Sequence, residues 1–175
     1  MRAFLVAVAA TVFLAMPASA ASPPYVIQGD RAVGGLQIAR GTLAQARQRF
    51  GAPSSVRARA SGVECNAAWN RIGLRLAFLD FSGRACQDGV LVTATITSRS
   101  AWRTAVGLRV GDSVARVRQL YPRASLHPAS PPWTGYWLVT RRTCAEVGAL
   151  PYPGLLARVR GGRVSALVAG TAPCD

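Results

Sequence analysis

The chain of 175 residues is 50% hydrophobic and strongly basic, with 21 arginines, no lysine, seven acidic residues and a formal net charge of +14. Its single histidine and its four cysteines, none in C-x-x-C spacing, argue against a zinc site, and we expect neither a metal nor a cofactor. At this length the chain forms one compact domain or two half-size lobes that share a core.

The N-terminus is typical of a secretory signal peptide. A basic start precedes an apolar run from Ala3 to Met16, and residues 17–20 end it with the small residues of an A-x-A cleavage site. The alternative, a membrane anchor, would need about 20 apolar residues, and no second apolar stretch follows. We therefore predict a signal peptide over residues 1–20 and a secreted or extracytoplasmic chain from Ala21, without a transmembrane segment.

A short helix is predicted after a leader arm at residues 21–28 and an irregular segment at residues 29–40. Thr42 is the expected N-cap, and Gln45 completes a capping box. The stripe formed by Leu43, Ala46 and Phe50 predicts one buried face, and Gly51 to Pro53 end the helix.

Alternating and β-branched residues then predict four antiparallel strands, at residues 56–60, 64–69, 74–78 and 90–97. Residues 70–73 form the turn between the second and third strands, and residues 82–89 form the loop that carries Cys86. A connection over residues 98–109 follows, in which Trp102 is expected to lie beneath a second helix.

The second helix is predicted over residues 114–121, after a polar cap at Asp112 and Ser113. Its apolar stripe comprises Val114, Val117, Leu120 and Tyr121. Strands are predicted at residues 123–126, 135–141, 154–160 and 163–169, with a tight Gly-Gly turn before the last strand.

The two helices are similar in sequence: Leu43–Phe50 recurs as residues 114–121 with the same Ala, Arg and Gln, and residues 92–96 resemble residues 164–168. We therefore predict an α+β fold of two tandem repeats, each a short helix packed on an antiparallel sheet of about four strands. The first repeat spans residues 21–99 and the second residues 100–175.

Four cysteines in an exported chain predict two disulfides. Three pairings are possible, and the repeat boundary near residue 100 separates the cysteines two and two. We predict Cys65 with Cys86 and Cys144 with Cys174.

No arrangement of residues specifies a reaction, and we expect no enzyme activity. His127 lies in a proline-rich segment that offers no orienting carboxylate, so we interpret it as a solvated loop residue. The acidic residues are scattered, and no glycine-rich loop has the helix and lysine of a phosphate site.

Aromatic and arginine residues on or beside the second strands are better candidates, because Trp, Tyr and Arg anchor protein interfaces. The predicted binding residues are Trp69, Arg71, Arg75, Trp133, Tyr136, Trp137, Arg141 and Arg142. The alternative is that Trp69 and one of Tyr136 and Trp137 belong to the core. Strand alternation puts Tyr136 and Trp137 on opposite faces, so at least one should lie outside the helix-covered core.

The segment from Gly41 to Pro53 resembles the helix motif of the small lipoproteins of the outer-membrane assembly machine. Its duplication with antiparallel strands resembles the fold of the secreted β-lactamase-inhibitor proteins. This resemblance implies a concave sheet that grips an enzyme, with residues 70–73 and 142–153 as the loops that enter it. Arg71 stands where that family would place an acidic residue, so inhibition of a β-lactamase is not implied.

The sequence thus predicts a secreted, non-catalytic binding protein whose partner is a secreted or envelope protein. The alternative is a cell-envelope protein held electrostatically to anionic wall polymer or lipid, with no specific binding of nucleic acid. An arginine excess without lysine is also typical of GC-rich coding sequences, so the charge does not by itself decide between them.

Overall fold

The computed structural model describes residues 25–128, 133–142 and 149–170. These residues form a mixed α+β fold, as predicted, in which two short helices accompany mostly sheet. The elements in chain order are β1 (Tyr25–Gln28), β2 (Ala32–Val33), β3 (Leu36–Gln37), α1 (Leu43–Phe50), β4 (Ser55–Ala58), β5 (Glu64–Trp69), the 3-10 turn η1 (Asn70–Ile72), β6 (Leu74–Leu79), β7 (Val90–Ile96), β8 (Trp102–Thr104), α2 (Val114–Leu120), β9 (Ser125–His127), β10 (Gly135–Arg142), β11 (Pro151–Arg160) and β12 (Arg163–Gly170).

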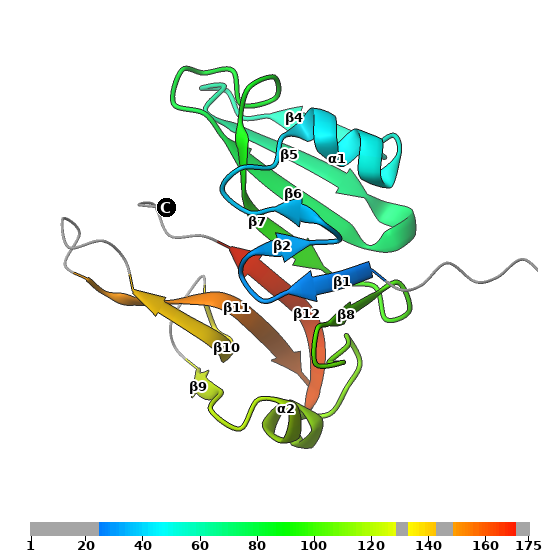
Figure 1. Ribbon diagram of the computed structural model, residues 1–175, viewed down its shortest axis with the longest axis vertical. Helices are drawn as coiled ribbons and strands as arrows, with labels where there is room; N and C mark the ends of the chain where they lie inside the picture. Colours follow the sequence, from blue (N-terminus) through cyan, green and yellow to red (C-terminus); the bar gives the residue numbers. More distant parts are fainter. Residues whose placement is uncertain (1–24, 129–132, 143–148, 171–175) are drawn as a thin grey trace, which may run out of the picture.

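Eight strands form one antiparallel sheet in the order β4-β5-β6-β7-β12-β11-β10-β9, and the other four form a small sheet in the order β3-β2-β1-β8. The strands β4 to β7 make one half of the large sheet and β9 to β12 make the other, and the halves join where β7 pairs with β12. Figure 1 shows α1 and the small sheet lying over one face of the large sheet. Within the described residues, neither helix has the length and apolar character needed to cross a membrane.

Helix α1 begins and packs as its sequence predicts. The amide of Gln45 donates to the Thr42 hydroxyl at 3.3 Å, and the Thr42 amide donates to the Gln45 side chain at 3.1 Å. Leu43, Ala46 and Phe50 are the buried residues of the helix. A helix this short is marginal alone, so packing on the sheet holds it in place.

Helix α2 is less deeply packed. Ser113 is its N-cap and accepts a hydrogen bond from the Arg116 amide at 3.2 Å, while Asp112 accepts from the Arg109 amide. Val117 is the buried residue of the helix, and Val114 and Leu120 are half-buried. Burial raises the pKa of the neighbouring Tyr121, and a hydrogen bond with Thr104 opposes this rise.

The small sheet corrects the prediction of a leader arm and an irregular segment at residues 21–40. Residues 25–28 form β1, which pairs in parallel with β8 and antiparallel with β2. Parallel pairing joins residues far apart in the chain, so no local pattern marks it. Residues 21–24 lie outside the described residues.

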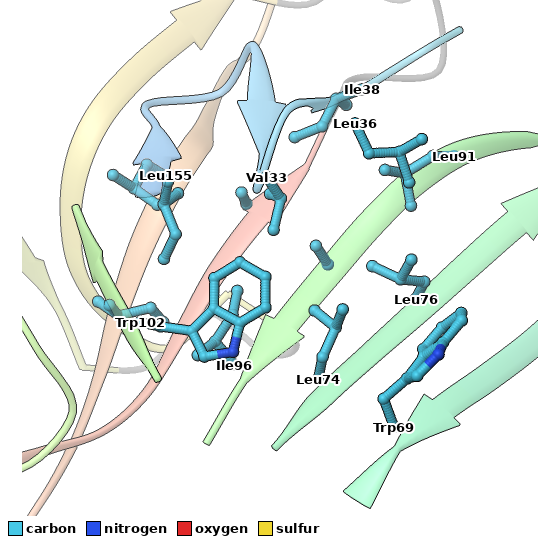
Figure 2. Packing of buried hydrophobic residues seen from close by; sticks show 14 of the residues in the cluster. Val33, Leu36, Ile38, Trp69, Leu74, Leu76, Leu91, Ile96, Trp102 and Leu155 are labelled. Carbon is cyan, nitrogen blue, oxygen red and sulfur yellow. The ribbon is translucent and has the colours of Figure 1, made fainter. Parts of the chain in front are cut away.

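Trp102 lies in the main core, but not where it was predicted. Its ring centroid is 4.7 Å from that of Tyr25 and 5.9 Å from that of Phe50, so its aromatic contacts are with β1 and the first helix, whereas the prediction placed it beneath the second. Its indole N–H donates to the carbonyl of Ile72 at 2.8 Å. Figure 2 shows Trp102 beside Val33 of the small sheet and Ile96 of the large one. The parallel β1–β8 pair places it there.

The predicted loop at residues 142–153 is shorter than expected. Strand β10 continues to Arg142, and β11 begins at Pro151, which pairs with Arg142. Two prolines are tolerated here because β12 pairs with β11 only from Leu155 onward, which leaves the earlier residues at an edge. Residues 143–148 lie outside the described part of the chain.

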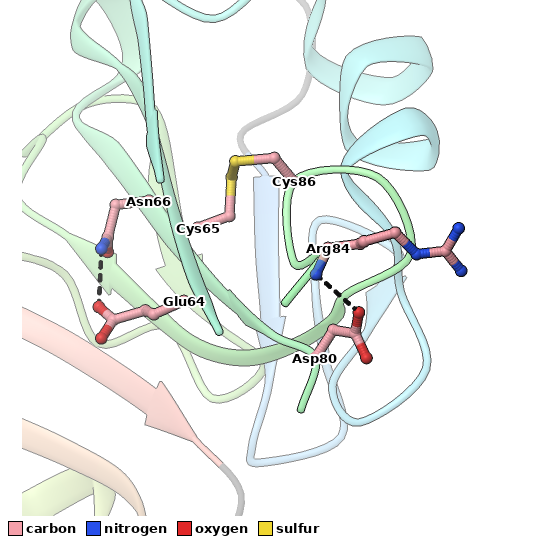
Figure 3. Close-up of a disulfide and its surroundings, with 6 residues drawn as sticks. All are labelled: Glu64, Cys65, Asn66, Asp80, Arg84 and Cys86. Carbon is pink, nitrogen blue, oxygen red and sulfur yellow. Dashed lines mark hydrogen bonds between the residues drawn. A yellow bond between two sulfur atoms is a disulfide. The ribbon is translucent and has the colours of Figure 1, made fainter. Parts of the chain in front are cut away.

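The predicted Cys65–Cys86 disulfide is confirmed and ties β5 to the loop after β6 (Figure 3). The predicted Cys144–Cys174 bridge falls on residues outside the described ranges.

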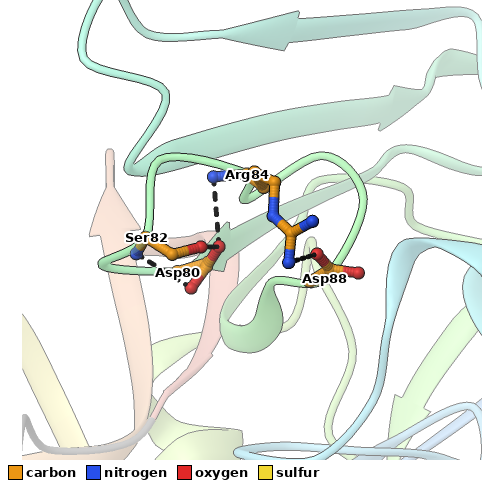
Figure 4. A network of polar contacts seen from close by, with 4 residues as sticks. All are labelled: Asp80, Ser82, Arg84 and Asp88. Atoms are coloured by element: carbon orange, nitrogen blue, oxygen red, sulfur yellow. Dashed lines mark hydrogen bonds and ion pairs between the residues drawn. The ribbon is translucent and has the colours of Figure 1, made fainter.

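The same loop is held by a polar network (Figure 4). Asp80 accepts hydrogen bonds from the Ser82 hydroxyl and amide and from the Arg84 amide, and Arg84 pairs with Asp88 at 2.7 Å. The hydrogen bond from the Ser82 side chain, more than any other contact, lowers the pKa of Asp80.

Candidate binding site

The large sheet has one face covered by the helices and the small sheet, and a second face, here called the open face, over which no described helix or strand lies. A second hydrophobic cluster, distinct from the main core, is formed by Trp137, Leu156 and Val168, with Trp133 packed against it. The register of the strands places these cluster residues of β10, β11 and β12 side by side on the open face.

The cross-strand pairing produces one continuous row of residues on the open face. From β4 to β9 the paired residues are Ser55, Ala68, Arg75, Thr95, Val168, Leu156, Trp137 and Ser125. This open-face row is small, polar and cationic at one end and aromatic at the other.

The aromatic end is a stacked assembly. The Trp137 indole N–H donates to the carbonyl of Trp133 at 2.9 Å, and the His127 ring stacks on Trp137 with centroids 3.6 Å apart and planes 13° apart. Trp137 is only 6% exposed, whereas Trp133 and His127 are half-buried and Ser125 is exposed. The accessible part of this end is therefore its rim of His127, Trp133 and Ser125.

The interpretation of His127 as a solvated loop residue is wrong, because His127 lies in β9. Its Nε2 lies 2.9 Å from the hydroxyl of Ser125. A nucleophile and a base are then in contact, but catalysis also needs a group that orients the base, and no described carboxylate is hydrogen-bonded to His127.

The opposite end of the open-face row is hollow and basic. A cleft of about 370 Å³ is lined by residues of β4, β5 and β6, including Arg57, Asn66 and Arg75. Arg57 and Arg75 are exposed. Arginine is one of the residues enriched at protein interfaces.

Two of the predicted binding residues belong to the main core. Trp69 is 3% exposed beneath α1, and its indole N–H donates to the Gly51 carbonyl at 2.8 Å. Tyr136 is 5% exposed, and its hydroxyl accepts a hydrogen bond from Arg118 at 3.2 Å. Strand alternation correctly separated Tyr136 from Trp137, which lies outside that core.

Three predicted arginines lie away from the row. Arg71 is exposed on η1, beside a cleft of about 230 Å³ that Trp69 also lines. Arg141 forms an ion pair with Asp30 of the β1–β2 turn, and both Arg141 and Arg142 line a further cleft next to that turn. Of the eight predicted residues, the structure brings Arg75, Trp133 and Trp137 to the open face.

Sequence reasoning missed the cleft that contains Arg141. Asp30, Arg31 and Arg40 line it, and all three lie in the segment predicted to be irregular. Among the described residues, no group of three or more His, Cys, Asp and Glu side chains is arranged to hold a metal ion.

Comparisons of the chain with protein-family models, with curated proteins and with solved structures found no match.

Proposed function

We propose that this is a non-catalytic, extracytoplasmic binding protein that holds another secreted or envelope protein on the open face of its large sheet. The observation that carries the proposal is the open-face row, which runs across all eight strands and has Arg75 towards one end and, towards the other, Trp137 with His127 stacked on it. Aromatic side chains and arginine dominate the energetics of protein interfaces, and the broad sheet offers them a rigid support.

The test uses Thr95, which lies half-buried in the middle of the row. Partner proteins are captured from the secreted and envelope fractions at about 150 mM salt, identified, purified and titrated against the full chain. Thr95→Arg introduces a long charged side chain at the centre of the contact, and we expect at least about a thirtyfold loss of affinity.

The matched control is Ala105→Arg, which adds the same charge at an exposed position after β8. It should leave the affinity within about twofold, since exposed substitutions away from an interface change little. A partner that binds the Thr95→Arg protein at full strength, or the lack of any partner at this salt concentration, would refute the proposal.

We also propose that the two halves are tandem repeats related to the β-lactamase-inhibitor-protein fold. The similar helices, each preceding four antiparallel strands of the large sheet, support this relation. Strand β8, which follows the proposed boundary near residue 100, pairs with β1 of the first half and so links the two repeats.

Export is part of the proposal and has its own support. The N-terminal residues have the pattern of a signal peptide, and the Cys65–Cys86 disulfide is compatible with an oxidising compartment. N-terminal sequencing of the exported protein should begin at Ala21, whereas an intact Met1 would contradict cleavage at this site.

A second candidate function is electrostatic retention on anionic wall polymer or lipid. Seven acidic residues cannot neutralise 21 arginines, so the surface carries an unbalanced positive field. The affinity for the polymer or lipid should then fall steeply as the salt concentration rises, and Thr95→Arg should not weaken it.

A further inference from the structure

Two adjoining clefts lie on the covered side of the molecule, away from the open face. One, of about 700 Å³, is formed by the β1–β2 turn, residues 38–40 and the ends of β10 and β11. The other, of about 430 Å³, lies between β3 and α1. They share the lining residues Gln37 and Arg40 and therefore adjoin there, and the two clefts together are called the groove below. Each has the size of an ordinary ligand site.

A strained turn places Arg40 at the junction of the two clefts. Ala39 has φ of 66°, a left-handed conformation that is unfavourable for a residue with a Cβ. The turn is held by hydrogen bonds from the Ala39 amide to Leu91 and from the Gly41 amide to Gln37, both 2.7 Å. Any Cβ at Gly41 would lie 2.7 Å from the Gln37 carbonyl, so close packing fixes this backbone path.

The groove is strongly cationic. Among the described residues its arginines are Arg31, Arg40, Arg49, Arg141 and Arg142, and the one acidic residue that lines it is Asp30. Asp30 is already paired with Arg141, and its side chain is only 11% exposed. Within the described part of the chain, Arg31 and Arg40 form no ion pair, so their charges face the groove and solvent.

Amide side chains line the groove together with the arginines. Gln28 and Gln37 line the larger cleft, and Gln37, Gln45 and Gln48 line the smaller one. Each amide offers donors and an acceptor, which suits hydroxyl groups, whereas the planar guanidinium suits a carboxylate. A ligand that carries both groups along a chain matches this mixed lining better than one that carries charge alone.

We propose that this groove binds a carboxylated polysaccharide chain, with Arg31 and Arg40 on its carboxylates and Gln37 and Gln48 on its hydroxyls. The proposal deepens the electrostatic candidate function by giving it a shaped site, and it is independent of the protein-binding proposal. Polyphosphate, which has charge but no hydroxyl groups, would use the arginines only.

The test titrates the full chain with a polyuronate oligomer of defined length, with polyphosphate of matched charge and with a neutral glucan. The double variant Arg31→Gln/Arg40→Gln is compared with Arg103→Gln/Arg123→Gln, which removes the same charge from exposed positions outside the groove. We expect the groove variant to bind polyuronate at least about tenfold more weakly, because charge-assisted hydrogen bonds are lost. The control should change affinity by less than about threefold.

A second pair of variants tests the amides. Gln37→Ala/Gln48→Ala should weaken polyuronate binding severalfold and leave polyphosphate binding unchanged. If Arg31→Gln/Arg40→Gln and Arg103→Gln/Arg123→Gln lose the same affinity for polyuronate, the groove is not the binding site. Electrostatic retention without a shaped site would then remain. Tighter binding of polyphosphate than of polyuronate would overturn the polysaccharide assignment, and binding of neither polyanion would overturn the groove and electrostatic retention together.

Discussion

At the scale of single residues, Ala39 holds a backbone conformation that its own chemistry disfavours. A left-handed φ brings Cβ too close to the following carbonyl, and the neighbouring hydrogen bonds to Leu91 and Gln37 keep the turn in place. Strain of this kind is often found beside functional sites, and here it adjoins the groove that contains Arg40.

Replacing Ala39 with glycine should therefore stabilise the fold. Glycine removes the left-handed penalty of about 1–2 kcal/mol but adds backbone entropy to the unfolded chain, so we expect a net gain of roughly 0.5–1 kcal/mol. Urea unfolding measures the free energy of unfolding. Ala44→Gly in α1 is the contrasting variant and should lose about 1 kcal/mol. A loss at both positions would contradict the strain at Ala39.

Asp80 makes the stability of the folded 80–89 loop depend on pH. Its pKa is lowered below 3.8 in the folded chain, first by the hydrogen bond from the Ser82 hydroxyl. A depressed folded pKa contributes stability above the unfolded pKa, and this contribution is lost as the pH falls through the folded value.

Asp80→Asn should flatten the acid dependence of stability. Between about pH 5 and pH 2 the native chain should lose more free energy of unfolding than the variant, because only the native carboxylate must be protonated. Asp88→Asn is the control, since Asp88 is exposed and pairs with Arg84 on the surface. Identical acid slopes for Asp80→Asn and the native protein would show that the network does not depend on the charge of Asp80.

At the scale of elements, the two helices differ in how firmly their sequences and their packing hold them. Helix α1 has a reciprocal capping box and three buried residues, whereas α2 has a single capping hydrogen bond, which Ser113 accepts from the Arg116 amide, and buries Val117. Since short helices depend on tertiary contacts, α1 should contribute more to the cooperative core than α2.

Thr42→Ala should accordingly cost more than Ser113→Ala. Loss of an N-cap costs about 1 kcal/mol, and the first turn of α1 also holds a helix that buries three residues, whereas α2 buries Val117. We expect a loss of roughly 1–2 kcal/mol for Thr42→Ala and about 0.5–1 kcal/mol for Ser113→Ala, measured by thermal and urea unfolding. The reverse order would mean that α2 is the more important helix for stability.

At the scale of the whole molecule, the two halves share one hydrophobic core. The main cluster includes Phe50 and Trp69 from the first half and Leu155 and Leu167 from the second. The β7–β12 pairing joins the halves in one sheet, and β8 returns to pair with β1. The halves should therefore unfold together.

Removing the disulfide in the first half tests this coupling. The Cys65→Ala/Cys86→Ala protein should lose about 3 kcal/mol, because the bridge closes a loop with a sequence separation of 21 residues. Amide hydrogen exchange should show the loss in β5 and in β11 alike. Reduced protection in β4 to β6 alone would indicate two independently unfolding halves.

The sequence by itself determined the helices, the strands of the large sheet and the Cys65–Cys86 pair. The helices and strands depend on residues close together in the chain: the stripe of Leu43, Ala46 and Phe50, the alternation along Glu64–Trp69, and a cap next to its helix. The disulfide followed from the division of the four cysteines between the two predicted repeats. Local periodicity records which face of an element is buried, so it can be interpreted without knowledge of the partner. It also separated Tyr136 from Trp137.

Only the tertiary structure decided what covers each face and which side chains meet. The parallel β1–β8 pair, the position of Trp102 and the contact between Asp30 and Arg141, 111 residues apart, have no local pattern that predicts them. The same is true of the open-face row and the arginine–glutamine groove, because both are assembled from several strands or turns. Short-range hydrophobic patterns specify elements, whereas a binding surface depends on the register and packing between them.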